Sequence, residues 1–255
     1  MKLIKLSARL QQIADRLPSG CRLADIGSDH ALLPVYAVQS GIASSAIAGE
    51  VNEGPFEAAS RQVAEAGLMS KVQVRKGDGL AVIDQGEADT ITIAGMGGAL
   101  IASILSAGSD KLAGVKRLVL QPNVGEDIVR RWLFEHGWYL LEEFILEEDG
   151  KIYEILTAVS DSDAAALNES LYQERTITGG AILTRELLLM MGPRLTEQPA
   201  GVFVAKWLSE IEKLDKIRKS VASSAQEASR EKEQQLANEI KQLKEVLTCL
   251  QKAKL

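Results

Sequence analysis

Near its amino terminus the chain reads Ala24-Asp25-Ile26-Gly27-Ser28-Asp29-His30, and this stretch decides the fold. It closes the apolar run Arg22–Ile26, which predicts a β-strand, and an apolar helical pattern begins directly afterwards at Ala31. A glycine in such a turn lets the backbone approach a ligand closely, and the first N–H groups of the following helix are unpaired. The stretch therefore predicts a strand–turn–helix cradle for a nucleotide-like ligand.

The composition of this turn narrows the ligand. Gly27 is its only glycine, so the turn lacks the G-x-G-x-x-G pattern of dinucleotide-binding proteins, and tight contact with a pyrophosphate is not expected. An adenosine ligand without phosphates tolerates a single-glycine turn. If that ligand also carries a methionyl ammonium group, acids such as Asp25 or Asp29 are favourable neighbours.

Two further acids follow later strands of the same pattern. Glu50 ends the second expected strand, where its carboxylate can accept hydrogen bonds from both hydroxyls of a ribose. Asp78 follows the third strand, flanked by Gly77 and Gly79, at the place where methyltransferases contact the adenine amino group. Taken singly, Glu50 also fits a solvated loop and Asp78 a simple Asp-Gly turn. Together, acids at three successive strand ends favour an S-adenosylmethionine site.

Two loops at the same expected edge of the sheet are candidates for contact with the methyl acceptor. Ala94-Gly95-Met96-Gly97-Gly98 follows the fourth strand, and its glycines admit close backbone approach. It lacks the acid or Asn, two prolines and aromatic residue that many amino-group methyltransferases carry there, so a ring-nitrogen target fits better. Gln121-Pro122-Asn123 ends the fifth strand, where its amides can orient a target base or simply form a turn.

Residues 1–160 alternate short apolar runs with amphipathic stretches, the pattern of βα units on a parallel sheet. A helix is expected first, over Leu6–Leu17. The last two strands are separated only by Leu146–Lys151, which suits a hairpin, so one antiparallel strand is expected to close the sheet. The expected strands are Arg22–Ile26, Ala46–Gly49, Val72–Arg75, Thr90–Ala94, Arg117–Gln121, Tyr139–Ile145 and Ile152–Ala158.

Residues 161–255 form the second expected domain, because the strand pattern stops near residue 160 and helix-favouring residues dominate afterwards. Two stretches there carry apolar residues at spacings of three and four, which gives each helix one narrow apolar stripe. Ser223–Ser229 between them lacks strong apolar anchors, so the stripes are expected to meet in an antiparallel coiled coil. The stripes are Trp207, Ile211, Leu214, Ile217 and Val221, and then Leu236, Ile240, Leu243, Leu247 and Leu250.

Composition limits the class of protein. The 255 residues are 46% hydrophobic, enough for a substantial core, but no stretch approaches the roughly 18 apolar residues of a membrane span. No signal-peptide pattern opens the chain, and Cys21 and Cys249 stand alone as expected reduced thiols, so we expect a cytoplasmic protein. The net charge of −6 argues against purely nonspecific nucleic-acid binding but permits a local basic face.

The histidines and the basic residues leave alternatives open. His30 is a candidate general base, although a histidine at a helix start is more often a cap or a hydrogen-bonded core residue. His136 is expected at a helix end, and neither histidine has a metal partner, so no metal site is expected. The basic residues are interpreted first as solvated and alternatively as RNA contacts: Lys213, Lys216, Arg218 and Lys219, and Lys71, Arg75, Lys76, Arg130 and Arg131.

Together these motifs resemble the bacterial TrmK family, whose members methylate N1 of adenine 22 in tRNA. The resemblance covers essentially the whole chain, and its most specific elements are Asp29-His30 and the loop Ala94–Gly98; it also includes Ser7, Arg9, Gln121–Asn123 and the terminal coiled coil. It implies an α/β fold of the Rossmann-like class I methyltransferases, with a seven-stranded, mostly parallel sheet containing one antiparallel strand. A C-terminal all-α coiled-coil domain would follow.

The resemblance also implies roles for single residues. Those expected around S-adenosylmethionine are Asp25, Gly27, Glu50, Val51, Asp78, Gly79 and Gly95, and those expected to face the adenine are Asp29, His30, Met96 and Asn123. The coiled coil would grip the tRNA, and no obligate protein partner is expected. Two alternatives remain: a methyltransferase of a small-molecule or protein substrate, and a coiled-coil binding module whose cofactor site is vestigial.

Overall fold

The computed structural model describes residues 3–222 and 227–252. The chain forms two compact units, Met1–Ser170 and Leu171–Leu255. The first unit contains the sheet, and its last helix, α6 (Ala164–Leu171), runs up to the border. The boundary expected from composition, after residue 160, falls at the end of the last strand of the sheet and precedes the border between the units, which lies after Ser170.

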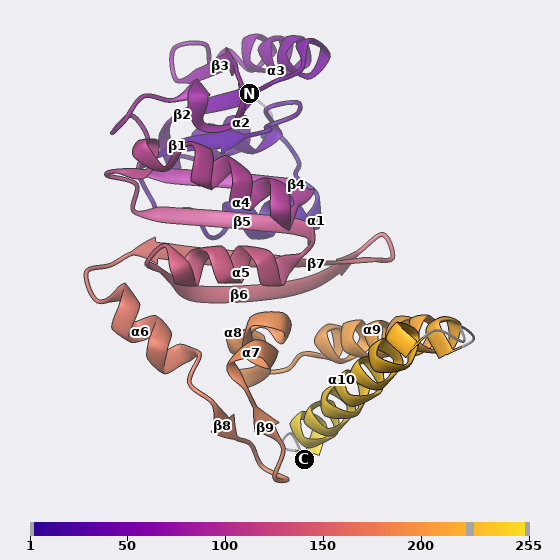
Figure 1. The fold of residues 1–255 in the computed structure, drawn as a ribbon. Helices are drawn as coiled ribbons and strands as arrows, with labels where there is room; N and C mark the ends of the chain where they lie inside the picture. Colours follow the sequence, from indigo (N-terminus) through magenta and orange to yellow (C-terminus); the bar gives the residue numbers. More distant parts are fainter. Residues whose placement is uncertain (1–2, 223–226, 253–255) are drawn as a thin grey trace. The chain divides into compact units, whose positions relative to one another are not determined.

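A seven-stranded sheet forms the centre of the first unit (Figure 1). Its strands are β1 (Cys21–Ile26), β2 (Ala43–Glu50), β3 (Val72–Lys76), β4 (Thr90–Gly97), β5 (Arg117–Val124), β6 (Trp138–Glu148) and β7 (Lys151–Ser160). Their order across the sheet is β3-β2-β1-β4-β5-β7-β6. The pairs from β3 to β5 are parallel, whereas β7 runs antiparallel to both β5 and β6. The prediction of a mostly parallel sheet with one antiparallel strand is confirmed.

The antiparallel strand does not lie where the sequence suggested, because β6 rather than β7 forms the edge of the sheet. Glu154–Ala158 in the middle of β7 are all buried, as an interior strand requires, while β6 alternates between buried and more exposed residues. The hairpin between them folds β7 back into the space beside β5.

Helices pack on both faces of this sheet (Figure 1). They are α1 (Ala8–Ala14), α2 (Leu32–Gln39), α3 (Glu53–Glu65), α4 (Gly98–Ala107) and α5 (Glu126–Glu135), with short 3₁₀ turns η1 (Gly79–Val82) and η2 (Ser109–Leu112). α4 packs against α5, and α1 packs against α2. α1 is shorter than the expected Leu6–Leu17, because the hydroxyl of Ser7 caps it by accepting the N–H of Leu10 and its last residues continue as turns.

The second unit ends in two long helices, α9 (Gly201–Ala222) and α10 (Glu227–Lys252), which pack along each other. Before them lie a two-stranded ribbon, β8 (Arg175–Thr176) and β9 (Ile182–Leu183), and the short helices α7 (Arg185–Met191) and α8 (Pro193–Glu197). Residues 223–226 of the expected connection lie outside the described residues. No helix in the described ranges is both long and apolar enough to cross a membrane.

The predicted apolar stripe is fully buried on α10 but not on α9. All five stripe residues of α10 are buried, whereas on α9 Ile217 is 51% exposed, so that part of the prediction is wrong. At about 100° per residue, Ile217 points roughly 120° away from Ile211, while Arg218 returns to the packed side. Arg218 accordingly pairs with Glu233 of α10 at 2.6 Å.

Candidate active site

The turn after β1 is strained and tightly attached to the end of β2. Gly27, Asp29 and Ala31 all have positive φ, at 70°, 50° and 53°, and the last two are not glycines. The N–H groups of Gly27 and Ser28 donate to the carbonyl of Gly49 at 2.9 and 3.1 Å. Because β1 and β2 are parallel, their carboxyl ends meet at one edge, where open α/β sheets bind ligands.

Asp25 lies buried beneath this turn. Its Oδ2 accepts a hydrogen bond from the Ser28 hydroxyl at 2.6 Å, and its Oδ1 accepts one from the Thr92 hydroxyl on β4. Burial raises the pKa of Asp25 from 3.8 to about 6, against the two hydroxyls, which lower it, and with a smaller contribution from the charge of Glu50. Because burial destabilises the ionised carboxylate of Asp25, a positive group placed nearby would stabilise it.

Glu50 joins three strand ends. Its Oε1 accepts the backbone N–H of Asp29, and its carbonyl accepts the N–H of Gly77 after β3 at 2.8 Å. The side chain is almost completely buried, and no described residue hydrogen-bonds to its Oε2. Glu50 therefore keeps one carboxylate oxygen for a ligand while its other oxygen holds the turn.

Asp78, Gly79 and Val51 lie around the ends of β2 and β3. Asp78 is exposed and precedes η1, where its carbonyl accepts the N–H of Ala81 at 3.0 Å, and Gly79 has a φ of 52°. Val51 is 54% exposed directly after β2. Asp78 and Val51 are thus accessible to solvent, and Gly79 is partly buried.

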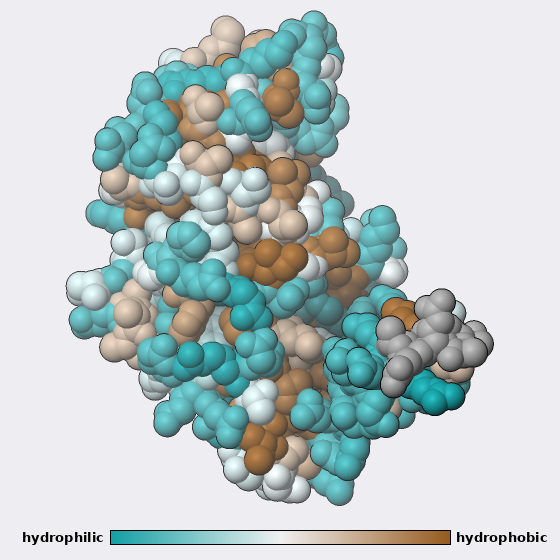
Figure 2. Space-filling view, in the orientation of Figure 1, coloured by the Kyte–Doolittle hydropathy of each residue, from teal (hydrophilic) through white to brown (hydrophobic). Residues whose placement is uncertain are grey.

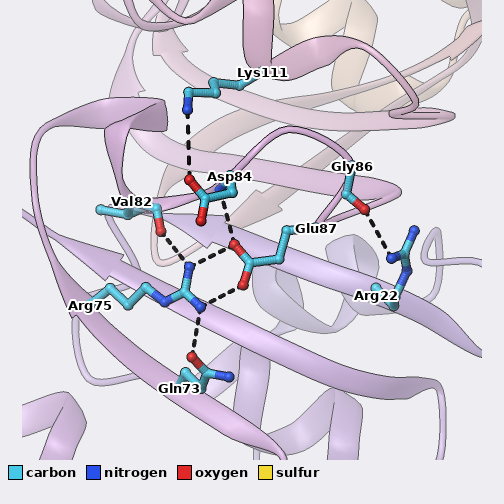
Figure 3. A network of polar contacts seen from close by, with 8 residues as sticks. All are labelled: Arg22, Gln73, Arg75, Val82, Asp84, Gly86, Glu87 and Lys111. Carbon is cyan, nitrogen blue, oxygen red and sulfur yellow. Dashed lines mark hydrogen bonds and ion pairs between the residues drawn. The ribbon is translucent and has the colours of Figure 1, made fainter.

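A polar network stabilises the segment that follows Asp78 (Figure 3). Arg75 of β3 donates to the carbonyl of Val82 at 3.0 Å and pairs through both terminal nitrogens with Glu87. The hydrogen bonds from Arg75 lower the pKa of Glu87. Arg75, considered as an RNA contact from sequence, is therefore engaged within the protein.

The loop after β4 lies against the turn after β1. A Cβ built on Gly27 would come within 2.1 Å of the Met96 Cε, so the methionine side chain packs directly over this glycine. Gly27 is required both by its positive φ and by this lack of space. Gly95, next to Met96, also has a positive φ, at 77°, and is exposed.

A chain of side-chain hydrogen bonds links α1 to the loops after β4 and β5. Arg9 donates through Nη1 to the Gln121 Oε1, which also accepts the N–H of Gly95 at 3.1 Å. The Gln121 Nε2 donates to the Pro122 carbonyl at 2.8 Å and to the Asn123 Oδ1 at 3.0 Å. The Asn123 Nδ2 donates in turn to the Gly95 carbonyl at 2.8 Å. Gln121 is fully buried, whereas Asn123 is exposed.

The sequence did not predict that Arg9 takes part in these hydrogen bonds. Arg9 lies 112 residues from Gln121, so no local pattern joins them. Glu148 of β6 accepts the N–H groups of Ala8 and Arg9, and the Arg9 guanidinium lies 5.2 Å from the centre of the Tyr153 ring. The β6–β7 hairpin thus holds the start of α1 in place.

Asp29 and His30 are exposed at the mouth of the turn. The His30 Nε2 lies 3.6 Å from the Asp29 Oδ1, and their side chains are 59% and 75% exposed. The alternative interpretation of His30 as a hydrogen-bonded core residue is therefore wrong. His136 ends α5 and stacks on Trp132 with ring centres 4.3 Å apart. Among the described residues no three His, Cys, Asp or Glu side chains form a metal-binding group.

The structure connects most of the candidate residues at one edge. Asp29 contacts Glu50, Met96 contacts Gly27, and Asn123 contacts Gly95. Gln121, whose amide was expected to orient a target base or to form a turn, supports them, as do Thr92, Ser28 and Arg9, which were not assigned site roles from the sequence. Asp78, Gly79 and Val51 are linked to this group only through the backbone next to Glu50.

The order of the strands, the single antiparallel β7 and the acidic ends of β1 and β2 together define a Rossmann-like class I methyltransferase. The chain belongs to the TrmK family, tRNA (adenine(22)-N(1))-methyltransferase, whose model matches residues 23–245. It is 47% identical over 249 residues to the tRNA (adenine(22)-N(1))-methyltransferase of Bacillus subtilis strain 168, covering 97% of this chain and 99% of the relative.

Solved structures agree with this assignment. The crystal structure of the B. subtilis m1A22 tRNA methyltransferase TrmK matches with a TM-score of 0.85 and 45% identity, covering 96% of this chain and 99% of that one. A Streptococcus pneumoniae protein solved in complex with S-adenosyl-L-methionine matches with a TM-score of 0.78 and 41% identity, covering 95% and 100%. The likeness therefore extends over both units.

Proposed function

We propose that this chain transfers a methyl group from S-adenosylmethionine to N1 of adenine 22 in tRNA. The observation that carries the proposal is the turn Gly27–Asp29, which is bonded to Glu50 on one side and covered by Met96 of the β4 loop on the other. Residues proposed for the cofactor and for the target thus share one edge of the sheet. Membership of the TrmK family supports the choice of substrate.

The residues at this edge suit S-adenosylmethionine. Glu50 has a carboxylate oxygen available for a ribose hydroxyl, and Gly95 presents exposed backbone without a side chain, whereas the Met96 side chain lies over Gly27. The ionised form of Asp25 would favour the methionyl ammonium group, and Asp78, Gly79 and Val51 would border the adenine. Bound there, the cofactor supplies an electrophilic methyl group on its sulfonium.

The target requires little acid–base chemistry from the protein. N1 of adenine is neutral near pH 7 and has a lone pair, so it needs no prior deprotonation. Methylation leaves a cationic ring, and the exposed carboxylate of Asp29 is suited to stabilise the growing charge. His30, Met96 and Asn123 would hold the base in line with the methyl group. The adenine must be unpaired or extruded first, because base pairing engages N1.

We assign tRNA binding in part to the second unit. The visible surface over α9 and α10 is mostly hydrophilic (Figure 2), and exposed cations such as Lys216 and Lys219 lie along α9. Such cations suit contacts with phosphates, which position a nucleic acid without reading its sequence. We propose that the protein needs no obligate protein partner and, because its proposed substrate is tRNA, that it acts in the cytoplasm.

The test uses the full chain, labelled S-adenosylmethionine and an unmodified tRNA transcript. We expect 1-methyladenosine after digestion to nucleosides, and no label in a transcript whose adenine 22 is replaced by guanine. Two results would contradict the proposal. One is transfer of the label to the amino group of adenine instead of N1, and the other is label in the transcript that carries guanine at position 22. Calorimetry with S-adenosylmethionine alone separates a vestigial cofactor site, which would not bind, from an enzyme that acts on another substrate.

A further inference from the structure

The hydrogen bonds around Gln121 determine how two amide groups are oriented. An arginine guanidinium and a backbone N–H can only donate, so the atom of Gln121 that faces both Arg9 and Gly95 must be its oxygen. The Gln121 Nε2 is then turned toward the Pro122 carbonyl and Asn123. This assignment follows from donor and acceptor chemistry, which is the only basis for distinguishing the two ends of an amide.

The same reasoning applies to Asn123. The Gln121 Nε2 is a donor, so Asn123 must present its oxygen to it, and its Nδ2 then faces the Gly95 carbonyl. Each of these groups retains capacity for a ligand: the Asn123 Oδ1 has a second lone pair and its Nδ2 a second hydrogen. Because the side chain is exposed, it offers one acceptor and one donor in a known order.

Adenine complements this pair of groups on one edge. Its Hoogsteen edge carries the N6 amino donor beside the N7 acceptor, and asparagine pairs with both at once. Guanine offers an acceptor at position 6 and would oppose the Asn123 oxygen. Recognition on the Hoogsteen edge also leaves N1 unoccupied, as methylation at that atom requires, whereas recognition on the Watson–Crick edge would cover it.

We propose that Asn123 selects adenine through the N6 and N7 atoms of its Hoogsteen edge, and that Gln121, oriented by Arg9, is the positioning residue that holds the Asn123 amide in the correct sense. This inference rests on the proposed function and specifies how the target base is recognised. Arg9 and Gln121 act through Asn123 and touch neither the base nor the methyl donor.

The decisive substrate is a full-length tRNA with 7-deazaadenosine at position 22, which lacks the N7 acceptor. Its N1 is more basic than that of adenosine, so slower reaction cannot come from a weaker nucleophile. For the unsubstituted enzyme we expect kcat/KM to be lower by on the order of 10-fold than with adenine 22, the loss of one hydrogen bond of a bidentate pair. A ratio of the two values that stays the same in Asn123→Ala would overturn the inference, because the difference in N1 basicity between the two tRNAs is the same for both enzymes.

Three variants test the hydrogen bonds that join Arg9, Gln121 and Asn123. Each is compared by the ratio of kcat/KM for the tRNA with adenine 22 to kcat/KM for the tRNA with 7-deazaadenosine 22. Asn123→Ala should lower this ratio to one or below, because the deaza base has the more basic N1. Gln121→Glu keeps the shape and still accepts from Arg9, but it cannot donate to Asn123, so it should lower the ratio as Asn123→Ala does. Arg9→Met should lower the ratio less, because the Gly95 N–H still orients Gln121. Arg61→Met is the matched control, since Arg61 is an exposed residue of α3 whose one ion pair among the described residues is with Glu57 of the same helix.

The outcomes are distinguishable. A ratio that falls in Asn123→Ala but not in Gln121→Glu would overturn the positioning role of Gln121. Reduced tRNA affinity in Arg9→Met at an unchanged ratio would show a phosphate contact and overturn the role of Arg9. Binding of S-adenosylmethionine by each variant shows that its site is folded. If the unsubstituted enzyme failed to methylate adenine 22 at all, the proposed function itself would be wrong.

Discussion

Asp25 lies under the turn after β1, where burial raises its pKa from 3.8 to about 6. Between these values the folded protein holds a proton that the unfolded chain has released. The stabilisation from this proton is complete below about pH 3.8 and is lost as the pH rises through about 6, a total of about 3 kcal/mol. Asp25→Asn removes the titration, so the unfolding free energy of the variant should decline less between pH 4.5 and 7. Urea unfolding without cofactor at several pH values measures this difference.

Asp149→Asn provides the control, because Asp149 is exposed in the β6–β7 turn and asparagine tolerates its positive φ of 51°. Its pH dependence should match that of the unsubstituted protein. An Asp25→Asn variant with the same decline as this control would contradict the assigned pKa shift.

At the scale of single residues, the sequence predicted which acids end which strands. Asp25 and Glu50 were identified from their positions after apolar runs, and the structure places both at the edge of the sheet. The support beneath them was not predictable, since Thr92 reaches Asp25 from a strand 67 residues away. Such contacts depend on the order of strands in space, which spacing along the chain does not specify.

The first turn of α4 packs backbone to backbone against the loop between β5 and α5. A Cβ on Gly98 would lie 1.9 Å from the carbonyl oxygen of Gly125, and backbone cannot rotate away as a side chain does. Gly98→Ala should therefore lower the unfolding free energy by about 3 kcal/mol or more. Chemical denaturation measures it.

Gly54→Ala is the matched control within α3, because nothing lies within 4 Å of a Cβ there. Alanine favours helix over glycine by about 0.5–1 kcal/mol, so this variant should be neutral or slightly more stable. Equal losses in both variants would show that the contact with Gly125 is not the cause.

Lys216 offers a test of the RNA contact proposed for α9. It is exposed and has no ion pair among the residues that the structure describes, whereas neighbouring Lys219 pairs with Asp215 at 2.7 Å. If Lys216 contacts a phosphate, Lys216→Glu should weaken tRNA binding and reduce the salt slope of the binding constant by about one. Titrations at several salt concentrations measure both, and S-adenosylmethionine affinity should not change. Unchanged tRNA binding would leave Lys216 as a solvated residue.

The boundaries of elements were predicted less well than their existence. Each of the seven expected strands lies within an observed one, because apolar runs of this length report burial directly. The position of β7 inside the sheet was not predictable, since a hairpin is compatible with either order of its two strands. Ile217 was misassigned because a spacing of three, repeated twice, moves a residue away from the packed face of a helix.

For the whole molecule, the proposed site lies within the first unit, so cofactor binding should stabilise that unit selectively. S-adenosylmethionine at 100 times its Kd should add about 2.7 kcal/mol to the unfolding free energy of residues 1–170. Hydrogen exchange measured with and without cofactor should show slowing at the ends of β1 and β2 and none in α9 or α10. Equal protection in α10 would contradict a site confined to the first unit.

The cofactor class could be predicted from the sequence pattern, whereas the position modified in tRNA could not. Spacing of acids and glycines predicted the class of cofactor, because open α/β sheets bind ligands at the carboxyl ends of their strands, where these residues were expected. No physical pattern in 255 residues identifies position 22 of a tRNA, and that assignment depends on the family.

The hydrogen bond from the Asp29 N–H to Glu50 has a thermodynamic consequence. A ribose bound by Glu50 changes the partner that orients Asp29, and a base beside Asp29 changes the turn that Glu50 supports. The two ligands therefore bias one short segment of backbone, and whatever factor the first contributes to the affinity of the second is returned equally. The methyl donor and the target adenine would then bind cooperatively, and the presence or absence of one would change the affinity for the other by the same factor.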